Sequence, residues 1–430
     1  MIFLYNLGIK LYAFLIYIFH FFNKKAQLWV DGRRGLFSKI QTEVDRNQKH
    51  IWFHFASLGE FEQGRPVLEE IKKRHPQYPV IMTFFSPSGF ELRKNFPMAD
   101  HVYYLPIDSP GNAEKFVTLI NPLVAIFTKY EYWYNYFHVL HQKKVPLYVI
   151  SALFRPHQSF FKWYGSLSRK TLRLVSHFFV QDTKSVGLLK TIGLSNAKVS
   201  GDTRFDRVAR NAEAPRQFAQ VANFSKGSKT VVAGSTWPDD ETLIAGLIRH
   251  YPSWKFIVAP HEIKPEKIKA FEEKLLPATF LRYSDIDACT LPDSGADESL
   301  SSETPSPINN PQVLIIDNIG MLSSLYQYGD IAYIGGGFGA GIHNTLEAAA
   351  FGIPVIFGPK YQNFLEAVTL IKKGAGFSIS NEGELSNVFL KLQDEAVREQ
   401  AGKAAEIFVS ENKGATQTIL DFLDKHIFSR

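Results

Sequence analysis

Two acidic residues follow short apolar runs in the first half of the chain, at points where a strand is expected to end. Glu60 comes after the run 51–57 and Gly59, which allows a tight turn, and Glu131 comes after the run 123–128. A carboxylate at the exit of a strand can face a cleft and act as a general base. Glu60 fits equally well as a solvent-exposed acid in the first turn of a helix, which the helix dipole favours.

Glu131 stands within the cluster Lys129-Tyr130-Glu131-Tyr132-Trp133. An acid, a cation and aromatic rings together are typical of a site that holds a sugar. A surface Lys–Glu pair would account for the two charges equally well, so this spacing leaves both interpretations open.

Hydroxyl side chains stand at junctions of the same kind. Ser57 ends the run 51–57, and Ser86-Pro87-Ser88 follows the run 79–85. Small residues before a helix leave backbone N–H groups available to an anion or a sugar, and Ser88 also fits as a plain N-cap. The pattern makes Ser57, Ser86 and Ser88 candidate contacts to an anion or an acceptor.

In the second half, Gly234-Ser235-Thr236 closes the run 230–235 and precedes an expected helix. Such a junction can cradle a phosphate. His261 follows the next run, 254–260, which places it at the same rim of the predicted sheet.

A glycine-rich stretch, 335–341, follows the run 331–336 and is expected to enter a helix that carries His343, Asn344 and Glu347. Glycines let the backbone approach a phosphate, and a helix N-terminus favours its charge. Glu347 is four residues after His343, so a helix would place both on one face, where the carboxylate suits a ribose diol. These features favour a nucleotide-sugar site.

Two alternatives to that site stay open. The stretch also reads as a flexible glycine loop with no ligand. Gly335-x-Gly337-x-x-Ala340 nominally fits a dinucleotide fingerprint, but it lies late in the chain and no ribose-binding acid follows the next strand.

Apolar runs alternate with helical stretches along the chain, which predicts βαβ organisation and two doubly wound α/β units. The expected strands are 51–57, 79–85, 101–106, 123–128, 146–151 and 177–182, then 230–235, 254–260, 313–317, 331–336, 354–358 and 376–380. Ligands bind beyond the carboxyl ends of such strands. We expect domains at 26–206 and 207–410, an irregular linker up to about residue 229, an acidic surface-loop insert at 282–310 and a C-terminal helix at 411–430.

Residues 1–25 are expected to form a membrane-anchor helix. Eighteen of the first 22 residues are apolar or aromatic, Lys10 lies near the middle, and Lys24 and Lys25 follow. The length allows a bilayer span or a helix in the interface, and a buried core helix is the alternative. The lysines that follow place the rest of the chain on the cytoplasmic side.

The charge distribution and the cysteine count exclude several classes of protein. Residues 1–50 carry eight Lys or Arg and three acids, which is +5 of the net charge of +6. The nearly neutral remainder offers no broad basic face for a nucleic acid. The single cysteine, Cys289, excludes an intramolecular disulfide and a Cys-rich metal site.

The chain resembles the 3-deoxy-D-manno-octulosonic acid (Kdo) transferases of Gram-negative bacteria, which form glycosyltransferase family 30. The resemblance rests on ordered blocks: FASLGEFEQGRPV, TFFSPSGFE, TKYEYW, SGDTRFD, AGSTWPDDE, VAPHE and GIHNTLEAAAFGIPVIFGPKYQNFLEA. It implies a GT-B fold, two Rossmann-like domains facing a cleft, at the cytoplasmic face of the inner membrane. It further implies inverting transfer of Kdo from CMP-Kdo to a lipid A precursor, with no cofactor and no metal.

The resemblance also assigns roles. Glu60 matches the base, Glu131 matches a second important acid, and Gly234, Ser235 and Thr236 match the phosphate side. The block that matches the CMP-binding motif holds these residues: Gly341, His343, Asn344 and Glu347.

The sequence departs from the family pattern at several positions, and this leaves the cations open. His261 replaces a common arginine, so Arg204 and Lys360 are further candidates for the CMP phosphate. Lys129 or Arg65 would face the Kdo carboxylate.

The sequence leaves two rival functions open. One is another membrane-associated GT-B enzyme of envelope synthesis, a hexosamine transferase or an epimerase. The other is a membrane-anchored binding or scaffold protein.

Overall fold

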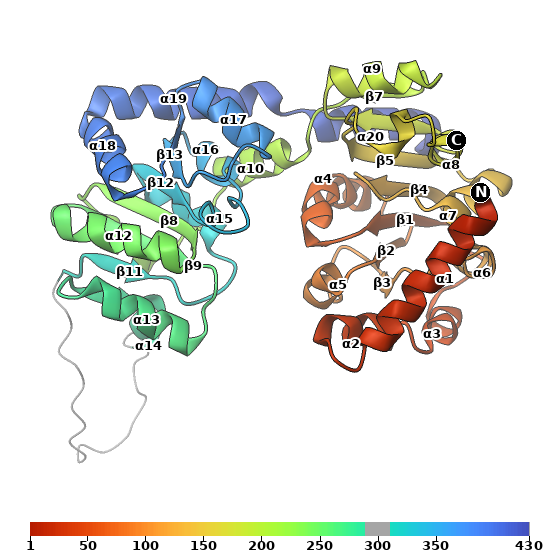
Figure 1. The fold of residues 1–430 in the computed structure, drawn as a ribbon, viewed down its shortest axis with the longest axis horizontal. Helices are drawn as coiled ribbons and strands as arrows, with labels where there is room; N and C mark the ends of the chain where they lie inside the picture. The colour runs from red at the N-terminus through yellow and green to blue at the C-terminus, as the bar shows by residue number, and fades with distance from the viewer. Residues whose placement is uncertain (289–309, 430) are drawn as a thin grey trace, which may run out of the picture. The chain divides into compact units, whose positions relative to one another are not determined.

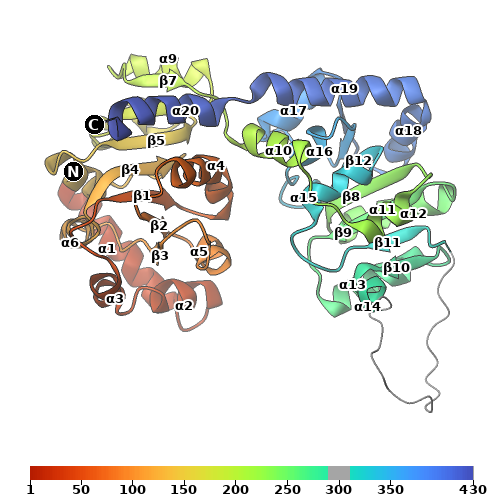
Figure 2. The same ribbon diagram turned by 180° about the vertical axis from the view of Figure 1, so that it is seen from behind.

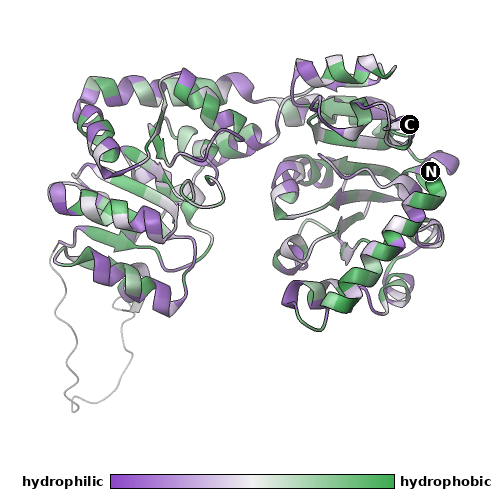
Figure 3. Ribbon diagram, viewed as in Figure 1, coloured by the Kyte–Doolittle hydropathy of each residue, from purple (hydrophilic) through white to green (hydrophobic). Residues whose placement is uncertain are grey.

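The computed structural model describes residues 1–288 and 310–429, which form two compact units (Figure 1). Unit 1 comprises Met1–Asp206 and Asn412–Arg430, and unit 2 comprises Arg207–Glu411. Each unit is built on one seven-stranded sheet whose neighbouring strands pair in parallel. Parallel sheets are buried on both faces, and the colouring in Figure 3 shows the apolar residues concentrated in these strands.

The sheet of unit 1 has the order β3-β2-β1-β4-β5-β6-β7. Its strands are β1 (His50–Phe55), β2 (Val80–Phe84), β3 (His101–Tyr104), β4 (Pro122–Thr128), β5 (Leu147–Ala152), β6 (His177–Val180) and β7 (Ala197–Val199). The order reverses between β1 and β4, whose register pairs His54 with Phe127. Ligand sites in doubly wound sheets lie at the carboxyl ends of the strands at this reversal.

The sheet of unit 2 has the order β10-β11-β9-β8-β12-β13-β14. Its strands are β8 (Thr230–Thr236), β9 (Lys255–Pro260), β10 (Phe280–Arg282), β11 (Val313–Ile315), β12 (Ile331–Ile334), β13 (Val355–Phe357) and β14 (Gly376–Ser378). Here the order reverses between β8 and β12, so the expected site lies after these two strands.

Helices cover both faces of each sheet (Figures 1 and 2). Those of unit 1 are α1 (Ile2–Phe19), α2 (Lys24–Asp31), α3 (Leu36–Glu43), α4 (Leu58–Arg74), α5 (Pro87–Arg93), α6 (Pro110–Ile120), α7 (Tyr134–Gln142), η1 (Ser159–Phe161), α8 (Ser166–Leu172), α9 (Thr183–Thr191), α20 (Ala415–Leu423) and η3 (Asp424–Phe428). Those of unit 2 are α11 (Ala219–Ser225), α12 (Pro238–His250), α13 (Pro265–Leu275), α14 (Tyr283–Ala288), α15 (Leu322–Leu325), η2 (Tyr326–Tyr328), α16 (Leu346–Ala349), α17 (Leu365–Lys372) and α18 (Glu382–Gln393). Two more helices cross a unit boundary: α10 (Arg204–Glu213) and α19 (Glu395–Asn412).

Several predicted segments differ from the structure. The expected linker before residue 229 contains helices α10 and α11 instead of irregular chain, and the short edge strands β7 and β10 are not among the predicted strands. The predicted insert at 282–310 begins inside β10 and α14, and its residues 289–309, with Cys289, lie outside the described residues. The C-terminal segment is broken at Gly414, whose φ is +110°, and α20 then packs its apolar residues into the core of unit 1.

Helix α1 runs along the outside of unit 1 (Figure 1). It is long and apolar enough to cross a membrane by length and composition, and none of its residues is fully buried. Its half-buried residues recur at helical spacing on one face: Ile2, Tyr5, Asn6, Ile9, Ala13 and Ile16. The rest of the helix exposes large apolar side chains, including Phe3, Leu7, Leu11, Phe14 and Ile18. The helix is therefore attached along one face and unpartnered on the other, which differs from a buried core helix.

Candidate active site

Glu60 lies in the first turn of α4, directly after β1. The helix begins at Leu58, so Gly59 is helical and forms no tight turn. The Glu60 side chain folds back, and its Oε2 accepts a hydrogen bond of 2.6 Å from the Ala56 N–H. This is the position of an acidic helix cap, but the side chain is half-buried and not solvent-exposed.

The surroundings of Glu60 make its carboxyl a weaker acid. Burial, and then the negative charge of Glu131, raise the pKa of Glu60 to about 7, against the lowering effect of the Ala56 N–H. A carboxyl with a pKa near the working pH is well matched to proton abstraction. The two predicted acids are therefore electrostatically coupled at the carboxyl ends of β1 and β4.

A chain of buried side chains holds Glu131. Its Oε2 accepts a hydrogen bond of 2.8 Å from Trp133 Nε1 and lies 3.3 Å from His54 Nε2. His54 Nδ1 lies 2.9 Å from Thr83 Oγ1, which also accepts a bond from Trp52 Nε1. Since a carboxylate only accepts, the Nε2–H of His54 donates to Glu131.

The cations predicted for unit 1 already have partners. Arg65 Nε donates to Glu69 Oε1 at 2.6 Å, and Arg204 binds Asp202 through Nε and Nη2 at 2.9 and 2.8 Å. Lys129 adopts a left-handed φ of +64°, and its Nζ lies 5.3 Å from the centre of the Tyr130 ring. The charge of Lys129 lowers the pKa of Glu60.

The predicted serine contacts differ from one another. Ser86 is the N-cap of α5 and accepts the Ser88 N–H, so Ser88 is not the cap. Ser57 is the N-cap residue of α4, but its hydroxyl makes no capping bond.

The glycine-rich stretch of unit 2 does not enter a long helix. After β12 the chain forms a loop, and α16 begins only at Leu346 and spans four residues. His343 is therefore a loop residue, and the prediction that it shares a helix face with Glu347 is wrong. The loop packs closely: Gly341 has a φ of +132°, and a Cβ there would lie 2.9 Å from the Phe364 ring. Packing of this kind, and not flexibility, requires the glycines.

Trp237, His261 and His343 form a stack of rings. The ring centres of Trp237 and His261 are 4.5 Å apart, and those of His261 and His343 are 4.6 Å apart. Trp237 Nε1 donates to His343 Nε2 at 3.1 Å, so that nitrogen carries no proton. Burial, and then the nearby His261, lower the pKa of His343 to about 4. His343 is therefore neutral near pH 7 and does not supply the cation for a phosphate.

Asn344 and Glu347 contact each other at the start of α16. Asn344 Oδ1 accepts the Leu346 N–H, and its Nδ2 donates to Glu347 Oε1 at 3.1 Å. Arg207 Nη2 lies 3.6 Å from the same Glu347 oxygen. Glu347 is therefore held in place by an amide and a guanidinium.

The predicted phosphate cradle at Gly234-Ser235-Thr236 has a different environment from the one expected. These residues still belong to β8, where Ser235 has a φ of +54° at an irregularity in the register. The following helix, α12, carries three acids in its first turn, and one of them, Asp240, accepts the N–H groups of Trp237 and Gly336. An anion gains little from a helix N-terminus that carboxylates already occupy.

A cavity of about 450 Å³ opens beside this ring stack. Its walls come from the start of α12 and from the glycine-rich loop, and include Trp237, Asp240, Phe338, Gly341 and His343. Lys360 Nζ donates to the carbonyls of Phe338 and Gly339 at 2.9 and 2.8 Å. The cavity thus lies after β8 and β12, the strands at the reversal of the sheet order.

Known proteins resemble this chain over most of its length. A profile of the family described as 3-deoxy-D-manno-octulosonic-acid transferase (kdotransferase) matches residues 30–207. The transferase of that name from Haemophilus influenzae is 26% identical over 394 residues, which cover 88% of this chain and 87% of the relative. The one from Aquifex aeolicus is 29% identical over 359 residues, which cover 80% and 85%. This chain is similar to the Kdo transferases over most of its length.

These relatives are Kdo transferases, and the chain is a glycosyltransferase, as the sequence resemblance implied. Solved structures support the fold. UDP-GlcNAc 2-epimerase from Neisseria meningitidis matches 88% of this chain with a TM-score of 0.60 at 18% identity and is covered completely. MurG from Acinetobacter baumannii matches 88% with a TM-score of 0.54 at 11% identity and is covered to 99%. The predicted GT-B class with two doubly wound domains is confirmed.

Sequence reasoning missed several residues that surround the two sites of this chain. They are Tyr5, His54, Arg207, Trp237 and Asp240. His54 gave a usable signal, because it is a histidine inside an otherwise apolar predicted strand. Trp237 and Asp240 directly follow the predicted Gly-Ser-Thr junction and are three residues apart, which is the spacing of a capping box at a helix N-terminus.

Proposed function

We propose that this chain transfers Kdo from CMP-Kdo to a lipid A precursor in lipopolysaccharide synthesis, with inversion and without a metal or other cofactor. The observation that carries the proposal is the electrostatic coupling of Glu60 and Glu131 at the point where the strand order of one sheet reverses. There the pKa of Glu60 is raised to about 7. A base of that strength takes a proton from a sugar hydroxyl as the new bond forms.

In the proposed reaction Glu60 accepts the proton of the acceptor hydroxyl. The hydroxyl oxygen attacks the anomeric carbon of Kdo from one face while the bond to the CMP phosphate oxygen breaks on the other. The products are the glycosylated acceptor, CMP and a protonated Glu60. A single displacement of this kind inverts the anomeric centre.

The donor half of the proposal draws on the cavity of unit 2. Its Trp237–His261–His343 stack offers aromatic faces to the cytosine ring of CMP. The Glu347 carboxylate, oriented by Asn344, can accept hydrogen bonds from the ribose hydroxyls. Because His343 is neutral, the CMP phosphate needs another cation. Lys360, which follows β13 and donates to two carbonyls of the glycine-rich loop, is the candidate.

We further propose that α1 holds the enzyme at the cytoplasmic face of the inner membrane by lying in the interface. Its attached face is fixed by polar bonds, Tyr5 to Asp108 at 2.5 Å and Asn6 to Asn135 at 3.0 Å. A span through the bilayer would break both bonds and leave Asp108, which is 2% exposed, without its hydroxyl donor. An interfacial helix keeps them and buries only the apolar face.

Product mass spectrometry with CMP-Kdo and a tetraacylated lipid A precursor tests the function, and counts the Kdo units added. We expect transfer that EDTA leaves unchanged, and calorimetry in which CMP binds and UDP does not. Binding of UDP in place of CMP would favour another nucleotide-sugar enzyme. Absence of both CMP binding and turnover would favour a binding or scaffold protein.

A further inference from the structure

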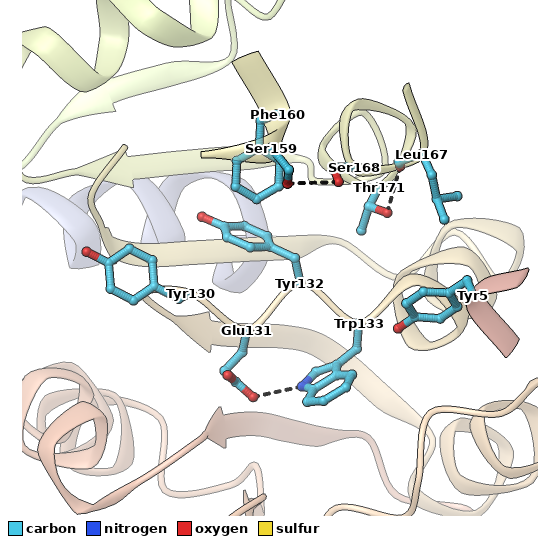
Figure 4. Close-up of a pocket in the computed structure, with 10 residues that line it drawn as sticks. All are labelled: Tyr5, Tyr130, Glu131, Tyr132, Trp133, Ser159, Phe160, Leu167, Ser168 and Thr171. Atoms are coloured by element: carbon cyan, nitrogen blue, oxygen red, sulfur yellow. Dashed lines mark hydrogen bonds between the residues drawn. The ribbon is translucent and has the colours of Figure 1, made fainter. Parts of the chain in front are cut away.

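A second cavity, of about 320 Å³, lies within unit 1 on the side of Glu131. Its walls come from three separate segments: the N-terminal helix, the turn after β4, and the stretch 159–171 (Figure 4). The side chains that the argument uses are Tyr5, Glu131, Tyr132, Trp133, Ser159 and Ser168. None of the site predictions from the sequence includes the first or the third segment.

Tyr5 belongs to this wall because α1 is fastened to the turn that carries Glu131. The Tyr5 hydroxyl donates to Asp108 Oδ2 and accepts the Tyr134 N–H at 3.4 Å. Asp108 in turn accepts the N–H groups of Asn135 and Tyr136, which lie in the first turn of α7. One buried carboxylate therefore joins the N-terminal helix to the helix start that follows Glu131 and Trp133.

The lining has the chemistry of a sugar site. Aromatic rings from Tyr5, Tyr132 and Trp133 can pack on the apolar face of a sugar ring, and hydroxyls from Ser159 and Ser168 can pair with its hydroxyl groups (Figure 4). The Tyr132 hydroxyl is buried and has no hydrogen-bond partner among the described residues. A buried hydroxyl without a partner costs free energy that a ligand can recover.

The charge of the lining selects among sugars. Glu131 is acidic, and the described residues that line the cavity include no lysine or arginine. A phosphate or the carboxylate of Kdo would meet this acid without a balancing cation. A neutral, hydroxyl-rich sugar ring fits, and the volume lies at the lower end of the roughly 300–1,000 Å³ of small-molecule sites.

We propose that this cavity binds a neutral sugar ring of the acceptor, and that Tyr5 of the N-terminal helix is part of that binding site whether or not a membrane is present. The proposal rests on the proposed function, because it assigns the ring to the acceptor of that reaction. Helix α1 would then have two functions: attachment to the lipid surface and binding of the acceptor sugar.

The test uses the full-length enzyme, vesicle-free buffer and an N-acetylglucosamine disaccharide, which is neutral and has no fatty acyl chains, so that the membrane plays no part. Tyr5→Ala removes the ring and the bond to Asp108. Ser168→Trp fills the cavity from the opposite wall and leaves α1 untouched. Leu7→Ser, on the exposed face of α1, is the matched control. Calorimetry gives the affinity for the disaccharide and for CMP.

We expect Tyr5→Ala to weaken disaccharide binding by about three- to tenfold, the worth of one aromatic contact. Ser168→Trp, which fills the cavity, should weaken it at least as much, and both variants should leave CMP binding unchanged. Leu7→Ser should bind the disaccharide like the wild type and lose affinity for vesicles. Unchanged disaccharide affinity in Ser168→Trp would overturn the proposal. So would a wild-type enzyme that transfers Kdo to the lipid acceptor but does not bind the disaccharide. A wild type that transfers to no acceptor would instead refute the proposed function.

Discussion

The Nε2 atom of His54 lies 3.3 Å from the Oε2 atom of Glu131, although the two residues are 77 positions apart in the chain. His54 is completely buried within β1, and Glu131 follows the neighbouring strand β4. The bond connects the interior of the sheet to the acidic side chain at its edge. His54 thereby acts as a positioning residue for Glu131.

Replacing His54 should impair turnover more than folding. His54→Phe keeps the volume but removes the bond to Glu131, and we expect kcat to fall about 10- to 100-fold, the range for a displaced active-site group. The KM for CMP-Kdo should stay unchanged. The control is His50→Phe, a buried histidine at the other end of β1, which should retain kcat. Equal losses in both variants would mean that His54 serves the sheet alone.

The pH dependence of transfer should report Glu60. The active form is the carboxylate, so the rate is expected to rise with pH and reach half its maximum at about pH 7. Glu131→Gln removes a negative charge that raises the pKa of Glu60. The midpoint should therefore move to lower pH, even if the maximal rate of the variant is lower. Burial, the larger cause, keeps the midpoint above the ordinary value of 4.5. A midpoint that does not move would contradict the coupling of the two acids.

Two substitutions of Glu60 separate catalysis from helix capping. Glu60→Gln removes the base and should abolish transfer. Because it keeps an oxygen that accepts the Ala56 N–H, the variant should be at least as stable as the wild type at pH 8. Glu60→Ala also loses that bond and should be less stable by about 1 kcal/mol. Transfer assays, CMP calorimetry and urea unfolding measure activity, donor binding and stability. Substantial activity in Glu60→Gln would refute the role of this residue as the base.

Acidification should destabilise unit 2 through His343. Its pKa is about 4 in the folded chain and 6.5 in the unfolded chain, so between these values the unfolded chain binds more protons. Stability is therefore retained above pH 6.5 and lost as the pH falls toward 4. Thermal unfolding of wild type and His343→Gln over this interval checks the prediction: the variant should lose less stability. Parallel curves would show that His343 does not take up the proton.

The basic residues of the first 50 positions should fall into two groups. Lys24 and Lys25 are exposed, and each charge removed by substitution with glutamine should cost about 1 kcal/mol of binding to anionic vesicles. Arg33 lies inside unit 1, where its guanidinium donates to the carbonyls of Trp29, Phe85 and Leu105. Arg33→Gln should therefore lower the unfolding temperature and leave vesicle binding unchanged. Sedimentation with vesicles and thermal unfolding distinguish the two groups.

The sequence by itself determined the order of the strands, apart from the short edge strands β7 and β10, and the strand that each polar junction follows. Parallel strands buried on both faces are continuous apolar runs, so β1 and β4 stand out in the sequence, and the acids had to follow them at one edge. The ordered motifs likewise indicated the resemblance to Kdo transferases. Local pattern was sufficient here because each of these features is encoded within a few adjacent residues.

Only the tertiary structure decided how the junctions work. Whether Glu60 is exposed or half-buried, and whether its pKa lies near 4.5 or 7, depends on burial and on Glu131, which is far away in the chain. The sequence predicts a helical His343, but its loop is fixed by packing against distant rings and strands that no local pattern records. The side of α1 that meets protein, and Tyr5 with it, depends on a buried carboxylate at Asp108. Burial and long-range charge are properties of the folded chain, and they turn candidate residues into a site.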